Sequence, residues 1–106
     1  MSRILVIDDE PQIRRFLSIG LESQGYTVVL AEDARAGLQA LVLEQPDLVI
    51  MDLGLPDMDG QALLLELRAI FAGPVLILSV RSNEREKVSA LDNGANDYVE
   101  KPFGVT

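Results

Sequence analysis

The sequence predicts an α/β fold: a doubly wound, five-stranded parallel sheet of strand order 2-1-3-4-5. Short apolar runs alternate with segments of helical spacing along the whole chain of 106 residues. Such alternation is typical of a parallel sheet with helices on both faces. No linker, repeat or low-complexity segment interrupts it, so one domain over residues 1–106 is expected. Five strands with a reversal of direction after the second fit the doubly wound order.

The first half of the chain supplies two strand–helix pairs and a third strand. A first strand is expected at residues 3–7, because after Arg3 the run is continuously apolar and rich in β-branched side chains, as buried strands are. Pro11 suits the first turn of a helix, where its missing N–H costs nothing, and Gly25 suits the end of that helix. A second strand is expected at residues 26–31 and a third, fully apolar and therefore central, at residues 48–51. Helical spacing places on the inward faces Ile13, Phe16, Leu17, Gly20 and Leu21 in the first helix, and Ala34, Leu38, Leu41 and Val42 in the second.

The second half continues the same alternation. Residues 52–60 are dense in turn-forming residues and lead into a third helix. Residues 75–78 form the fourth strand, and residues 82–84 can cap a fourth helix. That helix is expected to end at residues 93–94, before a short fifth strand at residues 97–100. The inward positions are Leu63, Leu67, Ile70 and Phe71 in the third helix, and Val88 and Leu91 in the fourth.

The handedness of the connections predicts how the helices are distributed. Crossovers between parallel strands are almost always right-handed, so the first helix is expected on one face and the next three on the other. The sequence stops at Thr106, directly after the fifth strand. We therefore expect the fifth helix to be missing or truncated, with apolar surface exposed beside the first helix. Such a fragment is expected to self-associate or to be less stable than an extended chain.

Composition excludes several classes of function. The formal net charge is −8, from 9 basic and 17 acidic residues, so the domain as a whole repels nucleic acid and anionic lipid. No signal peptide is present and no apolar stretch approaches the roughly 20 residues of a membrane span, so a cytoplasmic protein without a membrane partner is expected. Cysteine and histidine are absent, which removes thiolate metal sites and the commonest general base. Any metal must be held by oxygen, as Mg²⁺, Ca²⁺ or Mn²⁺ are.

Five polar residues directly follow predicted strands: Asp8, Asp9, Asp52, Ser79 and Lys101. Parallel strands place such residues at one edge of the sheet, where α/β proteins bind ligands. Three converging carboxylates repel one another, and a divalent cation removes that conflict. Lys101 and Ser79 offer a charge and a hydroxyl donor to phosphate. With no histidine, cysteine or glycine-rich loop, the available nucleophile is a carboxylate, and Asp52 on the central strand is the strongest candidate for a phosphoryl acceptor.

At these residues the chain resembles the receiver domain of bacterial two-component response regulators. It is similar to the OmpR/PhoB group and, within that group, to the regulators of potassium-transport (Kdp) genes. The resemblance covers nearly the whole chain in order and spacing. The matching segments are Ile7-Asp8-Asp9-Glu10, Asp52-Leu53-Gly54-Leu55-Pro56-Asp57-Met58-Asp59-Gly60, Ser79, Gly94-Ala95-Asn96-Asp97-Tyr98 and Lys101-Pro102-Phe103.

The resemblance implies a metal site and a phosphoryl acceptor. Asp52 would accept the phosphoryl group and also bind Mg²⁺, for which Mn²⁺ is an alternative. Asp9 would bind the metal directly, and Asp8 directly or through water. The backbone carbonyl of Gly54 would be a further metal ligand.

The resemblance also implies a switch. Ser79 would bond the phosphoryl group and shift with it, and Tyr98 would then turn inward. Lys101 would pair with the phosphoryl oxygens, and the Lys101–Pro102 peptide bond is expected to be cis. Receivers usually carry alanine or glycine after the switch hydroxyl, whereas this chain has Val80. Its bulk is expected to modulate the site by slowing phosphotransfer or hydrolysis relative to a Val80→Ala variant.

The partners implied by the resemblance lie outside this sequence. The phosphoryl donor would be a phosphohistidine on a sensor histidine kinase. Activation would form a homodimer of the full-length protein through the fourth helix, fifth strand and fifth helix. DNA would be contacted through an output domain that this sequence does not contain. The domain itself would catalyse only its own phosphorylation and dephosphorylation.

Two other classes of function stay open. A metal-dependent phosphohydrolase with an aspartyl nucleophile typically has a second acid two residues further on, where this chain has Gly54. A receiver that works without phosphate, as a pure interaction module, would not need the intact set of five strand-end residues. An assay with a small-molecule phosphoryl donor and Mg²⁺ distinguishes the three classes. A stable adduct on Asp52 supports the switch, fast turnover of added phosphoesters supports the phosphohydrolase, and no reaction supports the interaction module.

Overall fold

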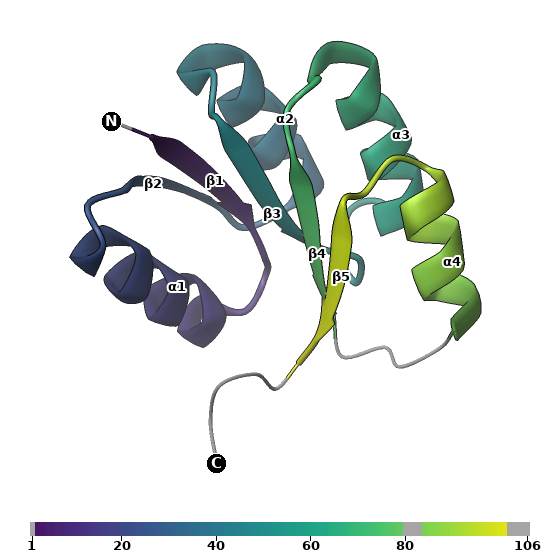
Figure 1. Cartoon of the computed structure of the whole chain (residues 1–106), viewed down its shortest axis with the longest axis horizontal. Coiled ribbons are helices and arrows are strands. Elements are labelled where there is room, and N and C mark those ends of the chain that lie inside the picture. Colours follow the sequence, from purple (N-terminus) through teal and green to yellow (C-terminus); the bar gives the residue numbers. More distant parts are fainter. Residues whose placement is uncertain (1, 80–83, 102–106) are drawn as a thin grey trace.

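The computed structural model describes residues 2–79 and 84–101. Five parallel strands form one sheet in the order β2-β1-β3-β4-β5 (Figure 1). The predicted α/β class and strand order are therefore confirmed. The strands are β1 (Arg3–Ile7), β2 (Thr27–Ala31), β3 (Leu48–Asp52), β4 (Val75–Ser79) and β5 (Asp97–Glu100); the helices are α1 (Pro11–Ser23), α2 (Ala34–Glu44), α3 (Gly60–Ile70) and α4 (Glu84–Asp92). None of the described residues forms a helix after β5.

The two faces of the sheet carry different helices. Alternate residues of a strand point to opposite faces, and β1 shows this directly: Ile4 and Val6 belong to one apolar cluster, Leu5 and Ile7 to another. Leu17 and Leu21 of α1 are partly buried and pack against the first cluster. The second includes buried residues of α2, α3 and α4. The predicted division of one helix against three is confirmed, and Figure 1 shows α1 apart from the other helices.

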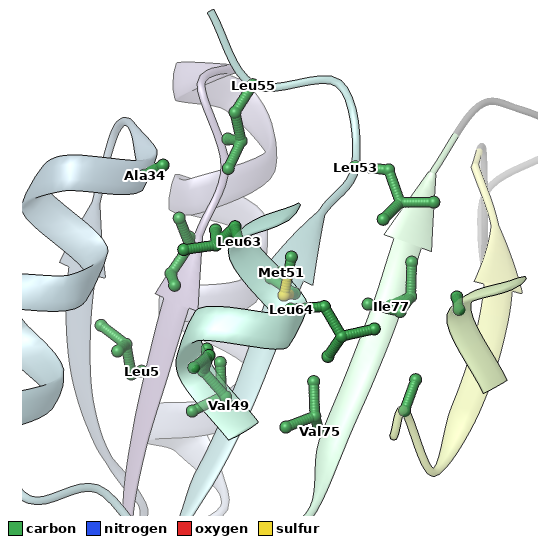
Figure 2. Packing of buried hydrophobic residues seen from close by; sticks show 14 of the residues in the cluster. Leu5, Ala34, Val49, Met51, Leu53, Leu55, Leu63, Leu64, Val75 and Ile77 are labelled. Atoms are coloured by element: carbon green, nitrogen blue, oxygen red, sulfur yellow. The ribbon is translucent and has the colours of Figure 1, made fainter. Parts of the chain in front are cut away.

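The main core lies between β1, β3, β4 and α3. Leu63, Leu64 and Leu67 of α3 are fully buried. Figure 2 shows Leu63 and Leu64 directed toward the strand residues, among them Met51. Burying each such side chain contributes on the order of 2 kcal/mol. This packing fixes α3 against the central strand, and with it the loop that follows Asp52.

Several apolar residues that helical spacing placed inward are instead exposed. In α2 the buried stripe is Ala34, Gly37 and Leu41, so Val42, about 100° further around the helix, lies outside it. Ile70 is the last residue of α3, and Phe71 packs against the core in its place. Helix α1 has no fully buried residue, which agrees with the expected exposed surface beside it. The exposed residues are Phe16, Gly20, Val42, Ile70, Val88 and Leu91.

Asp57, in the loop after β3, closes the amino-terminal end of α2. Its two carboxylate oxygens accept hydrogen bonds from the backbone N–H groups of Ala34 (2.9 Å) and Arg35 (3.0 Å). These bonds lower the pKa of Asp57 below its ordinary value of 3.8, because they favour the charged form. Asp33, the residue before the helix, bonds Ala36 in the usual capping manner. Asp57 therefore joins the loop that follows Asp52 to a neighbouring helix.

Replacing Asp57 with alanine is expected to lower the melting temperature at pH 7 by about 4 to 8 °C, as for the loss of one helix cap in a domain of this size. A carboxyl with a lowered folded pKa stabilises above its unfolded pKa, and this contribution is lost as the pH falls through the folded pKa. The difference between parent and variant should therefore narrow below pH 3.8. Melting curves from pH 7 downward measure this, with exposed Glu66→Gln as control. Equal melting temperatures at pH 7 would contradict the role of the cap.

The described residues include no helix that is both long enough and apolar enough to cross a lipid bilayer.

Candidate metal and phosphoryl site

The carboxyl edge of the sheet gathers four of the five residues that the sequence singled out. Asp52 and Ser79 are the last residues of β3 and β4. Asp8 directly follows β1, and Lys101 directly follows β5. Backbone hydrogen bonds from Asp8 to Ala31 (3.0 Å) and from Lys101 to Ser79 (2.7 Å) extend the ladders by one residue and fix these positions. All four residues are buried.

The ammonium of Lys101 lies at the centre of three carboxylates. Its Nζ is 2.7 Å from Asp8 Oδ2, 2.8 Å from Glu10 Oε1 and 3.4 Å from Asp52 Oδ2. The Lys101 side chain is only 3% exposed, so these contacts replace the water that the ammonium loses on burial. Lys101 therefore neutralises part of a buried acidic site at the strand ends.

Burial and pairing shift the pKa values of this cluster. Burial raises the pKa of Asp8, and the nearby charge of Asp52 adds to that rise, against the opposing effect of Lys101. Burial alone would lower the pKa of Lys101, but hydrogen bonds to Asp8 and Glu10 and the charge of Asp52 outweigh it and raise that pKa. Lys101 is consequently charged at every physiological pH. The site combines a fixed positive charge with carboxylates crowded enough to favour a further cation.

The carboxylates can hold a hard divalent cation. One oxygen from each of Asp8, Glu10 and Asp52 lies within 4.8 Å of the others. Of these three, Asp8 and Asp52 are the two that the sequence predicted as metal ligands, and carboxylate oxygens are the donors that Mg²⁺ and Mn²⁺ take. Asp52 Oδ1 accepts a hydrogen bond from the Gly54 N–H at 3.2 Å, which orients the Asp52 carboxylate. The residues present therefore fit the metal that the sequence predicted.

The structure adds Glu10 to the cluster, a residue that the sequence analysis did not select. Glu10 precedes Pro11, and its closeness to Lys101 across 91 positions of sequence becomes visible only in three dimensions. Its place directly after Asp8-Asp9 is the one signal that could have suggested it. Asp9 itself is exposed and is not among the three clustered carboxylates. Its role as a metal ligand, and that of the exposed Gly54 through its carbonyl, stay predictions.

Of the two predicted switch residues, Ser79 lies at the carboxyl edge of the sheet and Tyr98 lies in the core. Ser79 is 1% exposed at the end of β4. Tyr98 on β5 is buried within the main core cluster. Val80 and the Lys101–Pro102 bond fall outside the described residues. The switching role of Ser79 and Tyr98 and the modulating role of Val80 therefore stay predictions.

Fold and site together define a doubly wound α/β domain whose acidic site and lysine lie at the carboxyl edge of the sheet. The family model for the response regulator receiver domain matches residues 4–106. The chain therefore belongs to the response regulator receiver family, as the resemblance predicted.

Curated relatives extend this result. The chain is 49% identical over 105 residues to the KDP operon transcriptional regulatory protein KdpE of Escherichia coli, covering 99% of this chain and 47% of that protein. It is 51% identical over 105 residues to the transcriptional regulatory protein KdpE of Mycobacterium tuberculosis, covering 99% of this chain and 46% of that protein. The chain thus spans about half the length of the curated relatives it matches.

A solved structure gives the same fold. The BeF3-activated N-terminal receiver domain of Klebsiella pneumoniae RstA superposes with a TM-score of 0.90 at 28% identity, covering 94% of this chain and 86% of that one. The resemblance to Kdp regulators drawn from the motifs is likewise confirmed by the curated relatives. The family model and the curated relatives thus agree that the chain is a response regulator receiver domain.

Proposed function

We propose that this domain is a switch activated by phosphorylation, in which Asp52 accepts a phosphoryl group from a sensor histidine kinase in a Mg²⁺-dependent reaction. One observation carries the proposal: the Asp52 carboxylate ends the central strand, 3.4 Å from the Lys101 ammonium and within reach of two further carboxylates. This arrangement joins a nucleophile, a positive charge for phosphate and a metal-binding oxygen set at one sheet edge.

The proposed chemistry is a direct transfer. An oxygen of Asp52 forms a bond to phosphorus as the bond from phosphorus to the donor imidazole nitrogen breaks, and that nitrogen keeps the electron pair. Bound Mg²⁺ supplies positive charge that neutralises the phosphoryl oxygens. Lys101 orients the group and offsets its charge, and the Ser79 hydroxyl donates a hydrogen bond to it. Reversal to the free carboxylate occurs by attack of water on phosphorus with release of inorganic phosphate.

The proposed ligands for Mg²⁺, or Mn²⁺ in its place, are Asp8, Asp9, Asp52 and the Gly54 carbonyl. Asp8 and Asp52 belong to the observed carboxylate cluster. Asp9 is adjacent to Asp8 in the sequence, and it is exposed to solvent.

The proposed output is a change of surface. Ser79 and Tyr98 move with the phosphoryl group and alter the face formed by α4 and β5. In the complete regulator this change controls a homodimer and a DNA-binding output domain, with residues 1–106 as the receiver domain and the cytoplasm as the setting. The names of the KdpE relatives as transcriptional regulators support this proposal.

The proposal is tested with acetyl phosphate and Mg²⁺, followed by intact-protein mass spectrometry. We expect one phosphoryl group on the parent protein and none on Asp52→Asn. Asp92→Asn, which removes one exposed carboxylate at the end of α4, should be labelled as the parent is. Equal labelling of Asp52→Asn would contradict the proposal. Rapid hydrolysis of added phosphoesters would instead favour a phosphohydrolase. Absence of labelling in the parent and in every variant would favour an interaction module.

A further inference from the structure

We infer that Glu10 is a positioning residue that holds the Lys101 ammonium in the unphosphorylated domain and competes for it with a phosphoryl group at Asp52. Glu10 would thereby slow phosphorylation. The inference rests on the proposed function, because it concerns the same site. It depends on the geometry of Glu10, of Lys101 and of the two carboxylates beside them.

The backbone fixes the direction of the Glu10 side chain. Glu10 is the residue immediately before α1, where a side chain commonly caps the helix, yet it makes no side-chain cap hydrogen bond. Pro11 disfavours helical dihedrals in the residue before it, and Glu10 is extended at φ −87° and ψ 114°. Its N–H also donates to Asp8 Oδ1 at 2.9 Å. The Glu10 carboxylate is therefore carried on a constrained backbone toward Lys101 instead of the helix end.

The distances show which carboxylates hold the ammonium. Lys101 Nζ lies at full charge-assisted hydrogen-bond distance from Asp8 and Glu10, 2.7 and 2.8 Å. Its contact with Asp52 is longer, 3.4 Å. Asp8 and Glu10 together therefore draw the ammonium away from the residue at which phosphate is proposed to attach.

Burial distinguishes Glu10 from the two other carboxylates beside Lys101. The side chain of Asp8 is 2% exposed and that of Asp52 8%, whereas that of Glu10 is 38% exposed. A buried carboxylate that loses its partner suffers a large desolvation penalty, but a carboxylate at the surface exchanges its partner for water at little cost. Of these three carboxylates, Glu10 is the one suited to release Lys101. Gln12 Nε2, 3.3 Å from the other Glu10 oxygen, stays available as a partner.

The expected effect of Glu10 is on the approach of an anionic donor. With acetyl phosphate, an Asp52 oxygen bonds phosphorus as acetate leaves with the electron pair of the broken bond. The incoming phosphoryl oxygens need Lys101 and are repelled by Glu10. Glu10→Gln keeps the shape of the side chain and removes its charge. It should raise the phosphorylation rate at low donor concentration about threefold to tenfold, the range for losing one partly exposed charge-assisted contact.

The experiment measures the phosphorylation rate of Glu10→Gln and the parent against acetyl phosphate and Mg²⁺ concentration. We expect a lower donor concentration at half-maximal rate, with a smaller change in maximal rate and an unchanged Mg²⁺ requirement. The matched control is Glu44→Gln, which removes one carboxylate at the far end of α2 and should match the parent. Melting temperatures of the parent and the variant show whether the substitution changes stability. A merely structural effect would not lower the donor concentration at half-maximal rate.

The outcomes separate this inference from the proposed function. A slower Glu10→Gln that needs more Mg²⁺ would make Glu10 a metal ligand and overturn the inference. Rates equal to the parent would show that the Glu10–Lys101 contact does not govern the reaction, and would overturn it too. In both cases labelling of Asp52 in the parent leaves the proposed function standing. Absence of labelling in parent and variant alike would contradict the proposed function itself, and this inference with it.

Discussion

Replacing Gly60 with alanine is expected to destabilise the protein by about 3 kcal/mol, the upper part of the usual range for overpacking. Gly60 is the buried first residue of α3, and its N–H donates to the Leu53 carbonyl at 3.1 Å. A Cβ at this position would lie 2.3 Å from Leu53 Cα and 2.5 Å from Leu53 O. Both are backbone atoms of the residue that follows Asp52, so no side-chain rotation relieves the clash. Chemical denaturation measures the loss.

The same substitution at Gly20 is the matched control. Apart from its chain neighbours and the backbone of its own helix, a Cβ there meets no atom within 4 Å, and Gly20 lies exposed within α1. Alanine has the higher helix propensity, so Gly20→Ala should stabilise by about 0.5–1 kcal/mol. Gly60→Ala with parental stability would show that the loop after Asp52 adapts freely, contrary to the close approach of α3 to Leu53.

Replacing Lys101 with methionine is expected to cost about 3 kcal/mol without divalent cations, as for removing one member of a buried ion pair. The variant keeps the apolar stem but leaves the carboxylates of Asp8 and Asp52, 2% and 8% exposed, without their cation. Saturating Mg²⁺ should recover more stability in Lys101→Met than in the parent, because the ion then supplies the missing positive charge. Denaturation curves with and without Mg²⁺ measure both effects.

Lys87→Met is the control for this comparison, because Lys87 is exposed on α4. It should change stability by less than about 0.5 kcal/mol, as exposed substitutions usually do. Parental stability in Lys101→Met would mean that the three carboxylates do not depend on the ammonium. An equal Mg²⁺ effect in parent and variant would place the ion away from Lys101.

The strand order and the edge of the site could be predicted because they follow from local patterns. Each apolar run marks a strand, right-handed crossovers distribute the helices, and parallel strands bring Asp8, Asp52 and Lys101 to one edge. The side-chain contacts that support this site could not be predicted in the same way. The contact of Glu10 with Lys101 and the caps made by Asp57 join residues far apart in sequence and depend on loop conformation.

Helical spacing also overstated the width of the buried helix faces. A residue such as Val42 or Ile70 has the right spacing in sequence, but its burial depends on whether a neighbouring element lies opposite it. Val42 is 64% exposed and Ile70 60% exposed, because the sheet contacts only a narrow stripe of each helix. Spacing predicts which side of a helix can be buried, and only the packing of neighbouring elements decides how much of that side is covered.

The most direct test of the account locates the phosphoryl group chemically. The protein is incubated with acetyl phosphate and Mg²⁺ and then reduced with borohydride, which converts an aspartyl phosphate to homoserine, and the peptides are sequenced by mass spectrometry. The account predicts homoserine at position 52, and its absence when Mg²⁺ is removed by chelation. Homoserine at another aspartate with Asp52 intact, or at position 52 to the same extent without the metal, would contradict it.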